Sequence, residues 1–237
     1  MIDKTLISLD QDWAPNFVVK YVSDLLSKYN LRATWFITND FPFLDEMKKN
    51  KLFELGIHPN FESNSTQGNE PNVILDNLKK ILPHAKTVRT HSLFQSSRLL
   101  QKFQNFGLEN DSSILLTKTP GILPHFSKIS NLFRFPFFWE DDEELYDIPN
   151  WEYDHPEYHV TGLKIFNFHP IHIFLNSDTL ETYSRMKEKI NFSKLDQNSI
   201  QDFINKKNPG IGTFFQMMIS NLQNQQTYTI SELKNIK

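Results

Sequence analysis

Short runs of hydrophobic residues alternate along the chain with longer segments in which hydrophobic positions recur every three or four residues. The short runs predict strands, at residues 5–10, 33–38, 53–60, 86–92, 109–116, 132–141 and 163–174. The longer segments predict helices, at residues 15–29, 43–50, 73–81, 96–106, 178–190, 199–206 and 212–223. Strands that alternate with helices are typical of βαβ units around a parallel sheet, so we expect an α/β fold.

Three prolines set boundaries within this pattern. Pro15 stands near the start of the first helix, where a missing amide donor is tolerated, and Pro59 should end the third strand. Pro136 lies in the middle of the strand predicted at residues 132–141. Because proline cannot donate to a strand ladder, we expect an edge strand or a bulge there.

Length and composition fit one folded unit. The chain has 237 residues, a length that α/β barrels reach as one domain. Its 39% of hydrophobic residues, with 21 Phe, can fill a large core. We therefore expect a single domain over residues 1–237.

Charge and cysteine content narrow the function. The formal net charge is −3 with both signs mixed throughout, which provides no broad basic face for phosphates, so nucleic acid is not an expected partner. No secretion signal is visible and no apolar stretch approaches the roughly 18 to 20 residues that cross a bilayer, so we expect a cytoplasmic protein without a membrane span. The chain has no cysteine, so a zinc-like ion would need histidine and carboxylate ligands.

Polar side chains gather where the predicted strands end. In parallel α/β folds the carboxyl ends of the strands build the active site. Four strands supply the candidates: Asp10, Asp12 and Trp13 after the first, His58 and Asn60 after the third, Arg89 and His91 in the fourth, and His169 after the last. We expect these groups to meet at one rim of the sheet.

The acids and two of the histidines suggest a metal site. Asp10 and Asp12 point to the same side if the strand continues through Asp12, and a metal bound by one leaves the other free to act as a base. Asp12, His58 and His91 would give three protein ligands and an open position, as in catalytic zinc sites. The alternatives are solvated acids at a strand end and histidines held by structural hydrogen bonds.

Two further residues have candidate catalytic roles. Arg89 stands two residues before His91 and would pair with Asp10 as an ion partner; the alternative is a surface arginine. His169 has a near-neutral pKa in its unperturbed state and could protonate a leaving amine; the alternative is a histidine packed in the core.

Aromatic residues near the acids are candidates for sugar contacts. Trp13 follows Asp12 directly, and Trp139 lies in the run FPFFWEDD at residues 135–142. Aromatic faces stack on sugar rings, although aromatic residues more often pack in a core. We place Asn60 with these two tryptophans as candidate substrate-binding residues.

Together these segments resemble the motifs of the polysaccharide deacetylase superfamily, carbohydrate esterase family four, and more closely its divergent deacetylase-like branch. The resemblance runs in consistent order over residues 5–175 and implies a distorted (β/α) barrel of about seven strands. By the family's first and second motifs, Asp10 is the catalytic base, and Asp12 and His58 bind metal. RTHS at residues 89–92 resembles the third motif, whose arginine holds the base. FPFFWEDD and FNFHP resemble the fourth and fifth, which makes His169 the acid.

Three positions in two motifs depart from the family pattern. Gln11 separates two aspartates that are adjacent in the family, and Trp13 replaces the glycine that follows them. The second metal histidine of the family comes four residues after the first, where this chain has Glu62. The third metal ligand is then one of three residues: His91, Glu62 or Asn60.

The resemblance implies hydrolysis of an N- or O-acyl group, with acetyl the first expectation, on a carbohydrate substrate. The expected cofactor is a divalent metal, with Zn²⁺ the first choice. One alternative is a glycosidase that uses two carboxylates about 5 to 10 Å apart without a metal. The other is a catalytically inactive carbohydrate-binding protein that keeps the barrel. The sequence does not fix the oligomeric state.

Overall fold

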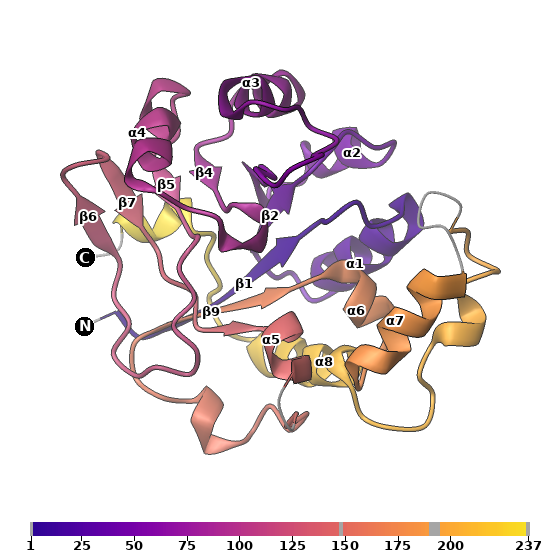
Figure 1. Ribbon diagram of the computed structural model, residues 1–237. Coiled ribbons are helices and arrows are strands. Elements are labelled where there is room, and N and C mark those ends of the chain that lie inside the picture. The colour runs from indigo at the N-terminus through magenta and orange to yellow at the C-terminus, as the bar shows by residue number, and fades with distance from the viewer. Residues whose placement is uncertain (1, 147–148, 190–194, 236–237) are drawn as a thin grey trace.

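The strands of the computed structural model form one curled sheet that resembles half of a barrel (Figure 1). The structure describes residues 2–146, 149–189 and 195–235. The sheet has nine strands in the order β6-β7-β5-β4-β3-β2-β1-β9-β8, parallel except for the antiparallel pair β6 and β7. Their bounds are β1 Lys4–Asp10, β2 Ala33–Ile37, β3 Phe53–Ile57, β4 Thr87–Val88, β5 Asn110–Asp111, β6 His125–Ser127, β7 Leu132–Arg134, β8 Trp139–Glu140 and β9 Leu163–Phe168.

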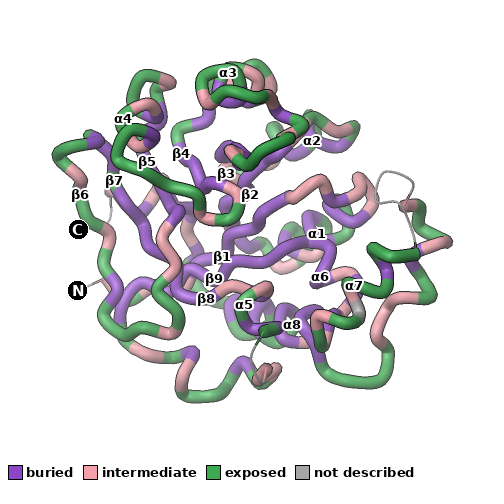
Figure 2. The backbone as a smooth tube through the Cα atoms, in the orientation of Figure 1, coloured by how far each residue is buried: buried purple, intermediate pink, exposed green. Residues whose placement is uncertain are grey.

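Helices cover the outside of this sheet, as the buried strands and exposed outer helix faces of Figure 2 show. The α-helices are α1 Asn16–Lys28, α2 Leu44–Met47, α3 Pro71–Ile81, α4 Ser97–Asn105, α5 Asp141–Tyr146, α6 Pro170–Leu175, α7 Leu180–Lys189 and α8 Ile211–Leu222. Short 3₁₀ turns are η1 His91–Leu93, η2 Pro156–Tyr158, η4 Gln201–Phe203 and η5 Ser231–Asn235. Helix α6 packs against α1, α7 and α8 on one side of the sheet (Figure 1).

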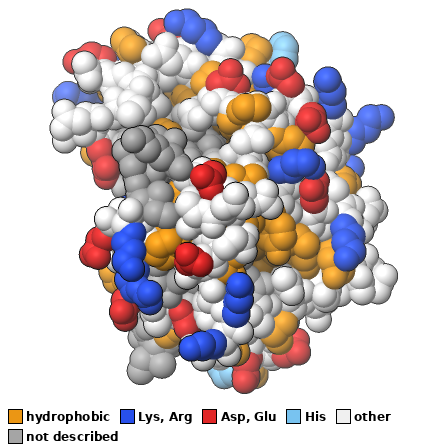
Figure 3. Space-filling model, turned by 90° about the vertical axis from the view of Figure 1, so that its right-hand side faces the viewer, with side chains coloured by type: hydrophobic (Ala, Val, Ile, Leu, Met, Phe, Trp, Pro, Cys, Tyr) orange, Lys and Arg blue, Asp and Glu red, His pale blue; other side chains and the backbone are white. Residues whose placement is uncertain are grey.

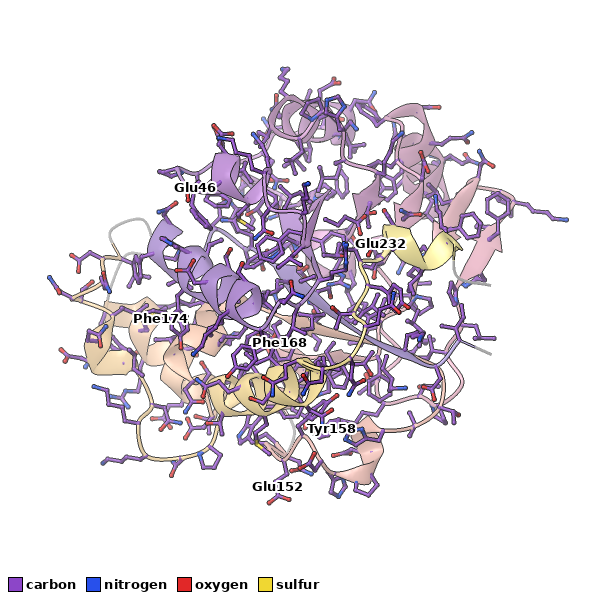
Figure 4. All side chains as sticks on the ribbon, turned by 180° about the vertical axis from the view of Figure 1, so that it is seen from behind. Glu46, Glu152, Tyr158, Phe168, Phe174 and Glu232 are labelled. Carbon is purple, nitrogen blue, oxygen red and sulfur yellow. The ribbon has the colours of Figure 1, made fainter. Side chains whose placement is uncertain are left out.

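A large part of the core packs around the neighbouring strands β1 and β9. Every residue of β9 is buried, as expected for a parallel strand covered on both faces. Its last residue, Phe168, meets the ring of Phe215 on α8 edge to face at 5.0 Å. Figure 4 shows Phe168 directed inward above this helix, whereas Phe174 lies farther out beside α1, where its ring contacts that of Phe17.

The first half of the chain follows the predicted α/β pattern closely. Strands β1, β2 and β3 and helices α1, α3 and α4 fall within or at most two residues beyond the predicted ranges, and Pro15 directly precedes α1. Helix α2 is a single turn, shorter than the segment predicted at residues 43–50. The fold class is therefore confirmed, although nine strands replace the expected seven.

Several other predicted elements are wrong in extent. The strand expected at residues 163–174 ends at Phe168, because Pro170 begins helix α6. The strand expected at residues 132–141 is two strands, since Pro136 separates β7, which pairs with β5, from β8, which pairs with β9. Three others are shorter: residues 86–92 contain only the two-residue β4 before η1, residues 109–116 contain only the two-residue β5, and residues 199–206 contain only the turn η4.

Two elements of the structure were not predicted from the sequence, and one predicted position is not among the described residues. Strand β6 and helix α5 have no counterpart in the predicted pattern. Helix α7 ends at Lys189, and the predicted last residue of that helix, 190, lies outside the described residues.

The surface carries no single sign of charge on the face seen in Figure 3, where acidic and basic side chains alternate between small hydrophobic areas. Over the described ranges, no helix is long and apolar enough to span a membrane.

Candidate active site

Side chains from both halves of the chain meet in a small cavity at the carboxyl ends of the parallel strands. The cavity has a volume of about 100 Å³. Its lining residues follow or end β1, β3, β4, β8 and β9: Asp10, Asp12, His58, Thr90, His91, Ser92, Leu93, Glu140, Asp142 and His169. Five of the predicted acids and histidines, Asp10, Asp12, His58, His91 and His169, therefore share one site.

Asp12 reaches the cavity through a left-handed turn, not through a continued strand. Strand β1 ends at Asp10, and Asp12 and Trp13 have φ angles of 41° and 55°. The expected alternation of side chains across a strand therefore does not apply to Asp12. The Gln11 side chain, which accepts hydrogen bonds from the backbone N and the hydroxyl of Thr38, ties the turn to the end of β2. The Trp13 backbone N donates to the same hydroxyl at 3.1 Å.

Three imidazoles surround the Asp12 carboxylate. Its Oδ1 lies 3.1 Å from His58 Nε2 and 3.3 Å from His91 Nδ1, and its Oδ2 lies 3.4 Å from His169 Nε2. Burial raises the pKa of Asp12, but the neighbouring imidazoles, His58 first, lower it by more, so its pKa lies well below the usual range. The carboxylate is charged at neutral pH.

The structure also tests whether these residues fit a metal ion. Among the described residues, Asp12 Oδ1 and His58 Nδ1 are buried polar atoms without a hydrogen-bond partner. One ligand atom from each of Asp12, His58 and His91 lies within 4.8 Å of the other two. One carboxylate and two imidazoles form a donor set that suits zinc and leaves a coordination position open. The residues fit a divalent cation.

Of the three alternatives for the third ligand, His91 has the right position. It follows β4, and its backbone N donates to the Pro59 carbonyl at 3.0 Å. Glu62 is exposed and does not line the cavity. The Oδ1 of Asn60 accepts a hydrogen bond from the Glu62 backbone N at 2.8 Å, so this side chain stabilises the loop, and it does not line the cavity either.

Asp10 is held by a buried arginine and a buried asparagine. Arg89 Nη1 donates to Asp10 Oδ1 at 3.2 Å, and Asn167 Nδ2 donates to Oδ2 at 2.8 Å. The Arg89 side chain has no exposed surface, and its guanidinium lies between the rings of Phe36 and Phe137, 4.4 and 4.2 Å from their centroids. Arg89 is thus an interior ion partner of Asp10 and not a surface residue.

His169 is oriented by the first residue of α5. Its Nδ1 lies 2.7 Å from Asp141 Oδ1, and its backbone N donates to Asp141 Oδ2 at 2.7 Å. Burial lowers the pKa of His169, but Asp142 and Asp141 raise it by more, so its pKa lies well above the usual range. The near-neutral value expected from the sequence is wrong, because two carboxylates next to the ring favour its charged form.

Four residues of the site were not predicted from the sequence: Glu140, Asp141, Asp142 and Asn167. Glu140 lines the cavity, Asp141 orients His169, and Asn167 bridges Asp10 to Glu140 through its amide nitrogen. Burial, together with the charges of Asp10 and Asp141, raises the pKa of Glu140 to about 7. The segment at residues 135–142 was a candidate because of its aromatic side chains. The acidic residues in the same segment were the signal that could have identified Glu140 and Asp141. Asn167 stands two positions before His169 within β9.

The two candidate tryptophans, Trp13 and Trp139, have different surroundings in the structure. Trp13 is half-buried beside the cavity, with its ring edge to face with that of His91 at 5.5 Å. Trp139 is fully buried, stacks on Phe214 at 5.0 Å, and donates from Nε1 to Glu144 at 2.8 Å. Trp139 therefore packs in the core, which was the alternative to a role in sugar binding, and it presents no face to a substrate.

Comparison with known proteins gives the following matches. The sequence model of the WbmS-like polysaccharide deacetylase family matches residues 7–187. A structure from Bordetella bronchiseptica, described as a candidate polysaccharide deacetylase involved in O-antigen biosynthesis, is similar with a TM-score of 0.83 and 29% identity, over 92% of this chain and 90% of that chain. No curated protein sequence gives a significant match.

Two further solved structures align with the chain at lower similarity. A 4-alpha-glucanotransferase from Thermococcus litoralis aligns with a TM-score of 0.55 and 11% identity, over 100% of this chain and 39% of that chain. A family 4 acetyl xylan esterase from Clostridium thermocellum, solved in complex with a cobalt ion, aligns with a TM-score of 0.46 and 16% identity, over 98% of this chain and 90% of that chain.

Proposed function

Because this chain belongs to the WbmS-like polysaccharide deacetylase family, we propose that it hydrolyses an N- or O-linked acyl group, acetyl in the first instance, on a carbohydrate. One observation carries the proposal. A carboxylate held by a buried arginine, a set of metal-ligating side chains and a histidine oriented by an aspartate line the same cavity. These are the parts that metal-assisted acyl hydrolysis requires.

Asp12, His58 and His91 are the residues that would hold a divalent cation, for which Zn²⁺ is our first choice. A cation bound there would polarise the acyl carbonyl and stabilise the negative charge that develops on its oxygen. The three residues come from loops after three different strands. Loss of one ligand should therefore weaken metal binding without removing a strand from the sheet.

Asp10 is the proposed general base. Its carboxylate lines the cavity, and Arg89 and Asn167 fix both of its oxygens. A water next to this carboxylate would lose a proton to it while attacking the acyl carbon. Arg89 holds the base in place and balances its buried charge.

His169 is the proposed general acid. Asp141 binds Nδ1, which leaves Nε2 on the side of Asp12, facing the cavity. The raised pKa of His169 keeps a proton on the ring at neutral pH, so the ring can donate it to the leaving nitrogen or oxygen. Trp13, at the edge of the same cavity, is our candidate for stacking against the sugar.

Acetate release tests this proposal directly. We expect the purified protein to release acetate from N-acetylglucosamine oligomers or from acetylated xylan. A chelator should abolish release, and added Zn²⁺ should restore it. A metal-independent glycosidase would instead release shorter sugars and ignore the chelator, and an inactive binding protein would release neither product. Either of those results would overturn the proposal.

A further inference from the structure

Hydrolysis of an amide moves one proton across this site in each turnover. Asp10 gains a proton from water as the new C–O bond forms, and His169 loses one to the leaving nitrogen as the C–N bond breaks. Before the next turnover Asp10 must lose its proton and His169 must regain one. This step rests on the proposed function, which assigns the base and the acid.

Glu140 lies where such a proton would pass. One carboxylate oxygen of Asp10, one of Glu140 and a ring nitrogen of His169 lie within 4.8 Å of one another. One water molecule or substrate hydroxyl can bridge gaps of this size. All three residues line the same cavity, so a bridging oxygen has room there.

Asn167 connects the two carboxyl groups. Its Nδ2 donates to Asp10 Oδ2 at 2.8 Å and to Glu140 Oε1 at 3.2 Å. Glu140 lies opposite Asn167 in the register of β8 and β9, so the sheet itself fixes this arrangement. The shared amide orients both carboxyl groups without transferring a proton itself.

The charged groups around Glu140 come from each neighbouring segment. Asp10 at the end of β1 and Asp141 at the start of α5 place negative charge near it, while Arg89 and His169 place positive charge. Burial acts first, and the net result raises the pKa of Glu140 to about 7. A carboxyl group held between Asp10 and His169 in this way can take up a proton on one side and release it on the other.

A second cation site is a poorer explanation for this cluster. Both oxygens of Asp10 already accept hydrogen bonds from Arg89 and Asn167, and Glu140 Oε1 accepts from the same asparagine. The Arg89 guanidinium already supplies positive charge at this end of the cavity. A further cation would have to compete with both.

We propose that Glu140 carries the proton from Asp10 to His169 at the end of each turnover. The O–H bond at Asp10 breaks as one forms at the Glu140 carboxyl. The O–H bond at Glu140 then breaks as an N–H bond forms at Nε2 of His169. Glu140 returns to its starting state, and no other reactant is consumed.

The variant Glu140→Gln tests the relay, because a glutamine cannot carry this proton. With N-acetylglucosamine oligomers as the probe, we expect steady-state acetate release to fall at least tenfold, with the first turnover losing less. Added imidazole, which carries protons through solution, should restore much of the rate. Glu140→Asp keeps a carboxyl group and should retain part of the rate without imidazole. Glu143→Gln removes the same charge at an exposed position of α5 outside the cavity and should match the wild type.

Several outcomes would contradict the relay. It fails if Glu140→Gln turns over at the wild-type rate, or if the loss is equal in the first and later turnovers and imidazole does not reverse it. The second result would mean that Glu140 only positions its neighbours. If the wild type itself releases no acetate, the proposed function fails first and the relay with it. If the wild type is active, the relay alone is at stake.

Discussion

At the residue scale, the site depends on pairs in which one side chain controls the charge or direction of another. Arg89 fixes Asp10, and Asp141 fixes His169. The sequence allowed the first pair to be predicted, because Asp10 ends one predicted strand and Arg89 lies two residues before His91 in another. It did not allow the second, because Asp141 begins a helix in a segment that the pattern predicted as a strand. The partner of a catalytic group is set by tertiary contacts, which hydrophobic periodicity does not encode.

Asp10→Asn tests the base. The amide keeps nearly the same shape and can still bind Arg89 through its oxygen, but it cannot take a proton from water. We expect the rate of acetate release to fall by about 10² to 10⁴-fold, the usual contribution of a general base. The metal content of the variant, measured by elemental analysis, should equal that of the wild type. Full activity in this variant would mean that another residue is the base.

Glu140→Gln should also change how stability depends on pH. The pKa of Glu140 is raised from 4.5 to about 7 in the folded protein. The folded state therefore binds this proton more tightly than the unfolded state, and the resulting stabilisation is full below about pH 4.5 and lost as the pH rises through about 7. Glutamine stays neutral throughout. As the pH increases from about 4.5 to about 7, the melting temperature of the variant should therefore increase relative to that of the wild type. A difference that does not change with pH would contradict the raised pKa.

At the element scale, the ends of strands and the turns after them decide where the functional groups lie. Strands β1, β2 and β9 could be predicted because each contains buried hydrophobic residues in a short run. The turns could not be predicted, because Asp12, Trp13, Ser92 and Leu93 have positive φ angles that their residue types rarely adopt. Both left-handed turns border the cavity, one beside Asp12 and the other beside His91. Strained backbone of this kind is common at functional sites.

A pair of substitutions at Trp13 tests this strain. Trp13 has a φ of 55°, a conformation that costs a non-glycine residue roughly 1 to 2 kcal/mol. Both Trp13→Ala and Trp13→Gly remove the ring and its contact with His91, but only glycine relieves the backbone. In urea unfolding we therefore expect the glycine variant to be more stable than the alanine variant by about 1 kcal/mol.

The same two variants report on the substrate. If Trp13 stacks on the sugar, both should raise KM for the acetylated oligomer by similar factors despite their different stabilities. The exposed residue Asn30, with a φ of 54°, provides a control outside the cavity. Asn30→Gly should leave KM unchanged. Equal stability of the alanine and glycine variants would argue against strain at this turn.

At the scale of the whole molecule, the last segment of the chain closes the end of the sheet opposite the active site. The Thr227 hydroxyl accepts from the Arg32 backbone N at 2.9 Å, just before β2. The Ser231 backbone N donates to Glu54 Oε2 at 3.0 Å near the start of β3. The buried side chains of Ile230 and Leu233 belong to the main core. The family match ends at residue 187, yet the fold depends on residues beyond it. The sequence pattern predicted none of these contacts, because they join segments far apart along the chain.

Removal of residues 227–237 tests this closure. The truncation exposes the core positions covered by Ile230 and Leu233, and burial of each such side chain contributes about 1.5 to 3 kcal/mol. We expect the free energy of unfolding to fall by about 3 kcal/mol or more. Lys234→Gln serves as the control, since the ion pair of Lys234 with the half-exposed Glu109 contributes at most about 1 kcal/mol. A truncated protein as stable as the full chain would show that the last segment is dispensable.

We propose that side chains from three separate loops, those of Asp12, His58 and His91, bind one cation. Its most direct test is an anomalous-scattering map of crystals grown with Zn²⁺. We expect one strong peak about 2.0 to 2.2 Å from an Asp12 carboxylate oxygen and from one ring nitrogen each of His58 and His91. Absence of a peak in this cavity, or a peak bound by Asp10, Glu140 and His169 instead, would contradict it.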